Sequence, residues 1–152
     1  MIKVFVASSS AAKRQAKVFI EGCEHPNIEF IPWWDEFQPG RTLLDELTRI
    51  KSNVHAALLI MSPEGISTTQ KGKEVVIPNL NVLFEFGLFY SAFGHENIAI
   101  VKYGNVNLPS DLGGYIHING SEFFKHNAGV PVGKKTKSEF NRWLDAMITV
   151  RK

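Results

Sequence analysis

Short apolar, β-branched runs alternate along this chain with segments whose apolar side chains recur at helical spacing. Strands are expected at 2–7, 28–33, 54–61, 97–103 and 115–118. Helices are expected after the serines at 8–10, after Thr42, after Asn79 or Asn81, and over 137–150. This alternation predicts an α/β fold in which a parallel sheet of about five strands carries helices on both faces. Right-handed crossovers favour a flavodoxin-like strand order.

Two connecting segments are predicted to be irregular. Residues 34–41, with the sequence WDEFQPGR, contain a Pro-Gly turn. Thr42 then has the residue type of a helix cap. Residues 62–78 form a polar stretch, longer than the about 12–15 residues of ordinary loops, which indicates a functional or mobile loop.

Composition limits the function classes. The 152 residues suit a single domain over 1–152, and a net charge of +2 does not indicate nucleic-acid binding. Cys23 is the only cysteine, so no internal disulfide can form, which is typical of a reducing compartment. Its place on the apolar stripe of the first expected helix predicts a core position. The chain starts directly with a strand and lacks a signal peptide's apolar region. No apolar run approaches the about 20 residues that span a membrane, so a cytoplasmic location is expected.

One carboxylate interrupts the most apolar stretch, NLNVLFEFGLFYSAFG at 79–94, where Glu85 is the only charged residue. Removing an ionised carboxylate from water costs several kcal/mol unless it is paired. The helix expected here starts at the carboxyl edge of the sheet, where ligands bind in open parallel sheets. Glu85 is therefore expected to face a ligand crevice. The alternative is a structural role, with nearby backbone N–H groups holding the carboxylate at the helix start.

Other side chains at the same edge are weaker candidates. The serines at 8–10 could bind a ribose or a phosphate, or simply cap a helix. Trp33 and Trp34 could stack on a flat heterocycle, although one of them is equally expected in the core. No GxGxxG follows the first strand and no His/Cys cluster has metal spacing, so neither a Rossmann dinucleotide site nor a metal site is indicated.

Four segments carry a family resemblance: VFVASSS, WWDEFQPGRTLLDEL, NVLFEFGLF and LPSDLGG, in this order. Together they resemble the bacterial TIR-like domain, described as predicted nucleotide-binding. That family includes the TIR portions of TIR–STING and related cyclic-nucleotide-triggered antiphage effectors. The resemblance covers roughly residues 2–118. Many members carry Arg-Asp directly before the NVLFE string, whereas this chain has Asn79 and Leu80.

The resemblance implies a flavodoxin-like TIR fold and, as in active members, NAD⁺ glycohydrolase activity with Glu85 at the position of the catalytic glutamate. NAD⁺ would be the substrate, with no further cofactor. The family also implies self-assembly through TIR–TIR contacts, involving the loop at 35–41, and a sensor domain or partner chain that binds a cyclic nucleotide. The candidate substrate-binding residues at the expected site are Ser8, Ser9, Trp33, Trp34, Phe37 and Asn81.

Three alternatives stay open at this point. A nucleoside deoxyribosyltransferase-like enzyme would use the same type of fold and a carboxylate nucleophile. A non-catalytic TIR module would bind nucleotide or assemble with other TIR domains, and Glu85 would then be structural. A flavin-binding flavodoxin is the most distant.

Overall fold

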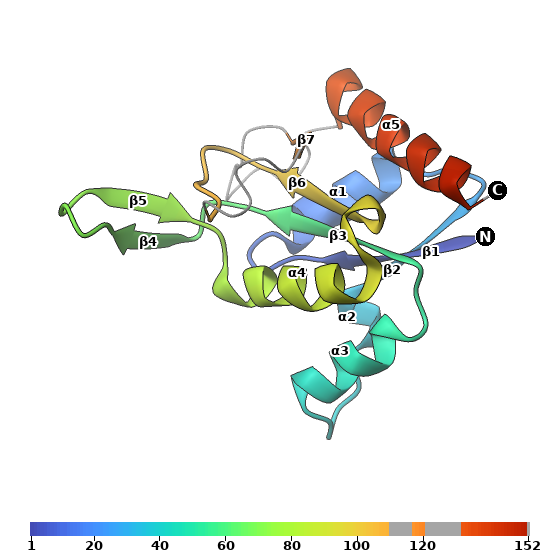
Figure 1. Cartoon of the computed structure of the whole chain (residues 1–152), viewed down its shortest axis with the longest axis horizontal. Coiled ribbons are helices and arrows are strands. Elements are labelled where there is room, and N and C mark those ends of the chain that lie inside the picture. The colour runs from blue at the N-terminus through green and yellow to red at the C-terminus, as the bar shows by residue number, and fades with distance from the viewer. Residues whose placement is uncertain (110–116, 121–131, 152) are drawn as a thin grey trace.

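The computed structural model describes residues 1–109, 117–120 and 132–151. In this part of the chain a five-stranded sheet has the order β2-β1-β3-β6-β7, and every pairing in it is parallel. Its strands are β1 (Ile2–Ala7), β2 (Ile28–Pro32), β3 (Ala56–Met61), β6 (Ile98–Lys102) and β7 (Ile118–Asn119) (Figure 1). The order is the flavodoxin-like one, so the predicted fold class is confirmed.

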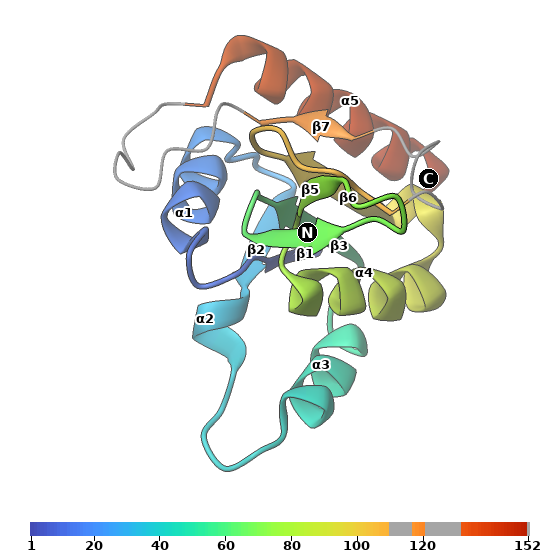
Figure 2. The same ribbon diagram turned by 90° about the vertical axis from the view of Figure 1, so that its left-hand side faces the viewer.

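Helices cover both faces of the sheet (Figure 2). The helices are α1 (Lys13–Gly22), α2 (Trp33–Glu36), α3 (Leu43–Lys51), α4 (Leu80–Phe93) and α5 (Lys134–Val150), with a 3₁₀ turn η1 (His95–Asn97). On one face Phe19 of α1 packs edge-on against Phe140 of α5, with ring centroids 5.5 Å apart. On the other face Phe89 of α4 packs against Phe5 of β1 at 5.0 Å. All six residues of β3 are buried between these two layers.

The carboxyl ends of β1 and β3 form the topological switch point of the sheet. The two strands are neighbours, but the chain leaves β1 towards α1 on one face and leaves β3 towards α4 on the other. In sheets of this kind ligands bind in the crevice that these diverging connections create. The strand arrows of Figure 1 point to this edge, and Figure 2 views the molecule from it.

The prediction of an irregular loop over 62–78 was wrong, because the segment forms an antiparallel hairpin. Its strands are β4 (Gly65–Thr68) and β5 (Glu74–Ile77), and it projects from the carboxyl edge of the sheet (Figure 1). Ile66 pairs with Val76 across the hairpin, and Gly72 in the turn has a φ of +77°, a conformation that glycine adopts without strain. The hairpin has little core to face, so its few β-forming residues lie among polar ones. No alternating apolar pattern therefore marks the two strands in the sequence.

The prediction for 34–41 also needs correction. A single helical turn, α2, begins this segment, and β2 ends at Pro32 rather than at Trp33. Pro32 lacks the N–H that a continuing ladder needs. The Thr42 cap is confirmed, since its side chain accepts a hydrogen bond from the Asp45 backbone N–H at 3.1 Å.

The remaining differences lie at element ends and at the edge of the described ranges. Strand β3 starts two residues later than expected and α5 begins at Lys134, one turn before residue 137. Cys23 is buried at the end of α1, as expected. Most of the LPSDLGG motif and the first two residues of the strand expected at 115–118 lie outside the described residues. Within those residues, no helix has both the length and the apolar character needed to cross a bilayer.

Candidate active site at the carboxyl edge of the sheet

Glu85 lies on the core-facing stripe of α4. The buried residues of this helix are Val82, Glu85, Phe86 and Phe89, a spacing of three, four and seven that places all of them on one helix face. Asn79 starts the helix, because its side chain accepts a hydrogen bond from the Asn81 N–H at 2.9 Å. The Glu85 side chain therefore takes a position that an apolar residue would normally fill, and Glu85 is only 7% exposed.

The carboxylate of Glu85 is desolvated without compensation from its described neighbours. No hydrogen bond or ion pair joins it to any residue of the described ranges. Burial raises its pKa from 4.5 to about 7, because the charged form loses its hydration. Backbone N–H groups of the described residues do not hold it, so the structural reading of Glu85 as a helix-start partner finds no support. A cationic ligand would favour its ionised form.

Trp33 and Phe37 lie on the face of the sheet that α4 covers. Both pack against the cluster that includes Val82 and Phe86, and their ring centroids are 5.9 Å apart. The Trp33 indole N–H donates to the Ser8 hydroxyl at 2.8 Å, which fixes the orientation of the ring. Three of the predicted residues thus occur together at this edge, on the layer that carries Glu85.

Trp34 belongs to the opposite layer. It packs against the cluster of α1 and α5, with Lys13 Nζ 5.4 Å and Lys17 Nζ 5.8 Å from its ring centroid. Adjacent residues of one helical turn point in different directions, so the two tryptophans pack on different layers, although their rings meet edge to face with centroids 5.8 Å apart. The structure therefore does not bring Trp34 to the face that carries Glu85.

Both predicted serines are already bonded within the chain. The Ser8 hydroxyl donates to the Ser9 carbonyl at 3.0 Å. The Ser9 hydroxyl donates to Oε2 of Glu64 at 2.5 Å and accepts from the Ala12 N–H at 3.1 Å. Their hydroxyls therefore organise the edge, Ser8 by orienting Trp33 and Ser9 by holding Glu64.

Sequence reasoning missed Glu64. The residue follows β3 at the same carboxyl edge, and the Ser62 hydroxyl also donates to its Oε2, at 2.6 Å. Its position just after the third strand indicated a residue at the ligand edge. The other hydrophilic residues of the stretch at 62–78 gave no reason to single it out. Asn81, in contrast, is exposed on the first turn of α4, four residues before Glu85, where its side chain is accessible to a ligand.

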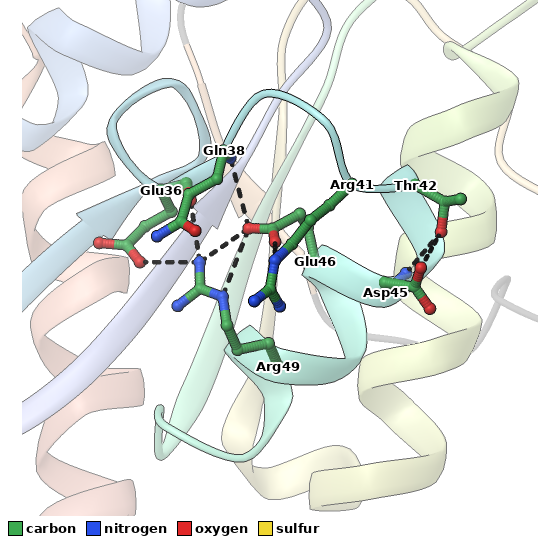
Figure 3. Close-up of polar contacts among 7 residues, drawn as sticks. All are labelled: Glu36, Gln38, Arg41, Thr42, Asp45, Glu46 and Arg49. Carbon is green, nitrogen blue, oxygen red and sulfur yellow. Dashed lines mark hydrogen bonds and ion pairs between the residues drawn. The ribbon is translucent and has the colours of Figure 1, made fainter.

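A separate ionic cluster fastens the segment after β2 to α3 (Figure 3). Glu46 is almost fully buried and receives Nη2 of Arg49 at 2.9 Å. Arg49 also donates to the Glu36 carbonyl at 2.8 Å. Nε of Arg41 lies 3.5 Å from the other Glu46 oxygen. The cluster holds both ends of the turn that carries Phe37. No cluster of three or more His, Cys, Asp or Glu side chains suited to a metal occurs among the described residues.

The comparison with known families decides the identity of the domain. The family described as the TIR domain of the CAP12/Pycsar effector protein matches residues 3–122. The chain belongs to this family. The match covers both strands of the switch point, the hairpin and α4 with Glu85, and the resemblance seen in the sequence is thereby confirmed.

Individual relatives are similar over most of this TIR domain. Protein tirC of Dictyostelium discoideum is 37% identical over 138 residues, which are 82% of this chain and 67% of tirC. CD-NTase-associated protein 12 of Sphingobacterium faecium is 32% identical over 114 residues, 74% of this chain and 34% of the relative. Pycsar effector protein BcPycTIR of Burkholderia cepacia is 30% identical over 116 residues, 74% of this chain and 38% of the relative. The chain thus spans little more than a third of these two bacterial relatives.

Proposed function

We propose that this TIR domain is an NAD⁺ glycohydrolase in which Glu85 acts on the nicotinamide–ribose bond. The observation that carries the proposal is the single buried carboxylate of α4, with its pKa raised to about 7 by desolvation, at the edge where this fold binds ligands. Structural carboxylates in cores are normally paired, and none of the described residues pairs with Glu85. The family resemblance, in which the catalytic glutamate matches this position, supports the same assignment.

The chemistry needs only one well-placed carboxylate. When the C–N bond breaks, its electron pair leaves with nicotinamide, which departs as a neutral molecule, and positive charge develops on the ribose. An ionised Glu85 in a low-dielectric site stabilises that oxocarbenium-like state. Water then adds to the ribose carbon and releases a proton, giving ADP-ribose, or an internal nucleophile closes a cyclic form. Because the leaving group starts as a cation, no general acid is required.

The neighbouring side chains suit the same substrate. Trp33 and Phe37 offer an aromatic surface for the nicotinamide ring, and Ser8 fixes the Trp33 ring through its 2.8 Å hydrogen bond. Asn81, exposed four residues before Glu85, can donate to or accept from a ribose hydroxyl. These residues bind and orient the substrate, whereas Glu85 acts on the reacting bond.

The decisive experiment measures nicotinamide release from NAD⁺ by concentrated protein, with wild type beside Glu85→Gln. The amide keeps the shape of the side chain, so a lost signal reports charge. We expect the variant to lose about 100-fold or more of the rate, as for other electrostatic groups at a transition state. Glu96→Gln, at an exposed carboxylate just after α4, is the matched control and should keep wild-type release. Equal release by wild type and Glu85→Gln would refute the role of Glu85.

The biological setting belongs to the same proposal. Two relatives are named for association with CD-NTases or as a Pycsar effector, which supports a role as an antiphage effector. The trigger would be a cyclic nucleotide, bound by a sensor domain or a partner chain. Activation would come from assembly of TIR domains, as in related effectors.

A further inference from the structure

Glu64 joins the two strands that flank the switch point. Ser9 follows β1 and Ser62 follows β3, and the hydroxyls of both donate to the same oxygen, Oε2 of Glu64, at 2.5 and 2.6 Å. The backbone N–H of Glu64 donates to the Ile77 carbonyl at the base of the hairpin, at 3.1 Å. The carboxylate is therefore held at the crevice where this fold binds ligands.

The second oxygen of this carboxylate is available to a ligand. Within the described ranges Oε1 of Glu64 makes no hydrogen bond and no ion pair, and the residue is only partly buried. With two serine donors on Oε2, the plane of the carboxylate is set before any ligand arrives. An ionised carboxylate only accepts hydrogen bonds, so the hydroxyls of a ribose are suitable donors to Oε1. Preorganisation of this kind lowers the entropic cost of binding.

The two carboxylates of the edge come from different elements. Glu85 lies on α4, whereas Ser9, which holds Glu64, leads into α1 on the other face. A dinucleotide bound along the carboxyl edge has two riboses, one for each of these carboxylates. Under the proposed function Glu85 serves the ribose that carries nicotinamide, which leaves the adenosine ribose for Glu64.

We propose that Glu64 accepts hydrogen bonds from the 2′ and 3′ hydroxyls of the adenosine ribose and so selects dinucleotides with a free diol. The inference rests on the proposed function for the identity of the ligand. A 2′-phosphate at the same place would set two like charges against each other and remove a donor. The domain would then discriminate NAD⁺ from NADP⁺ through Glu64.

Glu64→Gln separates this role from a structural one. The amide oxygen can keep accepting from Ser9 and Ser62, while an NH₂ group replaces the accessible Oε1 and the charge is lost. Thermal melting should therefore stay close to that of wild type. The matched control is Glu74→Gln, which makes the same charge change at an exposed position of β5 in the same hairpin.

The test measures, by calorimetry, the binding of ADP-ribose and of ADP-ribose that carries a phosphate on the 2′ oxygen of the adenosine ribose. These binding measurements need no turnover. Wild type and Glu74→Gln should prefer ADP-ribose by about 10-fold or more, the value of one hydrogen bond to a charged group. Glu64→Gln should bind ADP-ribose more weakly and lose most of this preference. If Glu64→Gln fails to fold, Ser62→Ala, which keeps the charge but loosens the carboxylate, should lower the preference by a smaller factor.

An unchanged preference in Glu64→Gln, or no binding of either ligand to wild type, would overturn the inference. Nicotinamide release, measured on the same preparations, separates it from the proposed function. Diol selectivity without turnover would refute only the glycohydrolase proposal. Turnover without diol selectivity would refute only the role of Glu64.

Discussion

Two buried carboxylates, Glu85 and Glu46, show how neighbours decide the chemistry of one residue type. Glu46 is 2% exposed, yet a hydrogen bond from Arg49 holds its pKa below 4.5, against the opposing effect of burial. Glu85 is similarly buried but has no such partner among the described residues, and burial raises its pKa to about 7. A paired carboxylate stabilises the fold in its charged form, whereas an unpaired one weakens the fold when it ionises.

The first prediction concerns stability at Glu85. Its folded-state pKa lies above its unfolded value, so the unfolded chain loses the proton first and the stability of wild type falls as pH rises from 4.5 to about 7. Glu85→Gln has no proton to lose. We expect the variant to become more stable than wild type across this window, reaching a difference of about 3 kcal/mol above pH 7. Urea unfolding at several pH values measures this, and a difference that does not vary with pH would contradict it.

The second prediction concerns the pH dependence of turnover. Because the reaction needs the ionised carboxylate, kcat/KM for NAD⁺ should rise with pH around a midpoint of about 7, the pKa of Glu85 without ligand. Bound NAD⁺ brings a positive nicotinamide ring, which favours the charged form, so the midpoint for kcat should be lower. Steady-state nicotinamide release between pH 5 and 9 tests this, and two profiles that are flat across the range would exclude Glu85 as the titrating group.

Elements were predictable from the sequence where burial made their pattern uniform. The buried strands β1, β3 and β6 are almost uniformly apolar, and the stripe of α4 follows helical spacing even though Glu85 interrupts it. The hairpin was not predictable in this way, because Ile66 is 70% exposed and its strands face little core. The bond between Ser9 and Glu64 joins residues 55 positions apart, which no local pattern reveals. The packing of Trp33 and Trp34 on opposite layers depends likewise on the unpredicted turn α2.

The third prediction concerns the attachment of the segment after β2 to α3. Glu46→Gln weakens the bonds to Arg49 and Arg41 and should lower thermal stability at neutral pH. Glu46 contributes stability above pH 4.5, and that contribution is lost as pH falls through its lowered pKa. The gap between wild type and variant should therefore shrink in acid. Melting temperatures at pH 7 and below pH 4 measure this, with Glu21→Gln at an exposed position of α1 as control. A gap that persists unchanged in acid would contradict it.

At the scale of the whole molecule, an apolar surface remains beside the site. Leu80 and Phe84 lie one turn apart on α4 and are 68% and 58% exposed, and Leu44 of α3 is 53% exposed. They lie on the layer that carries Glu85 but point away from the sheet. Contiguous apolar patches on a folded domain mark contact surfaces, whereas single exposed apolar residues do not. The proposed assembly of TIR domains would cover them.

The last prediction follows from that surface. Nicotinamide release per molecule should rise with protein concentration, because a second copy that covers Leu80 and Phe84 would also exclude water from the edge beside Glu85. Phe84→Ser should weaken this rise and lower the sedimentation coefficient of concentrated protein, while fusion to an oligomeriser should restore most of the activity. Val150→Ser is the control, since Val150 on α5 is also 68% exposed but belongs to the helix on the opposite face. If both variants behave alike, α4 is not the contact surface, and the exposed Leu80 and Phe84 would need another partner.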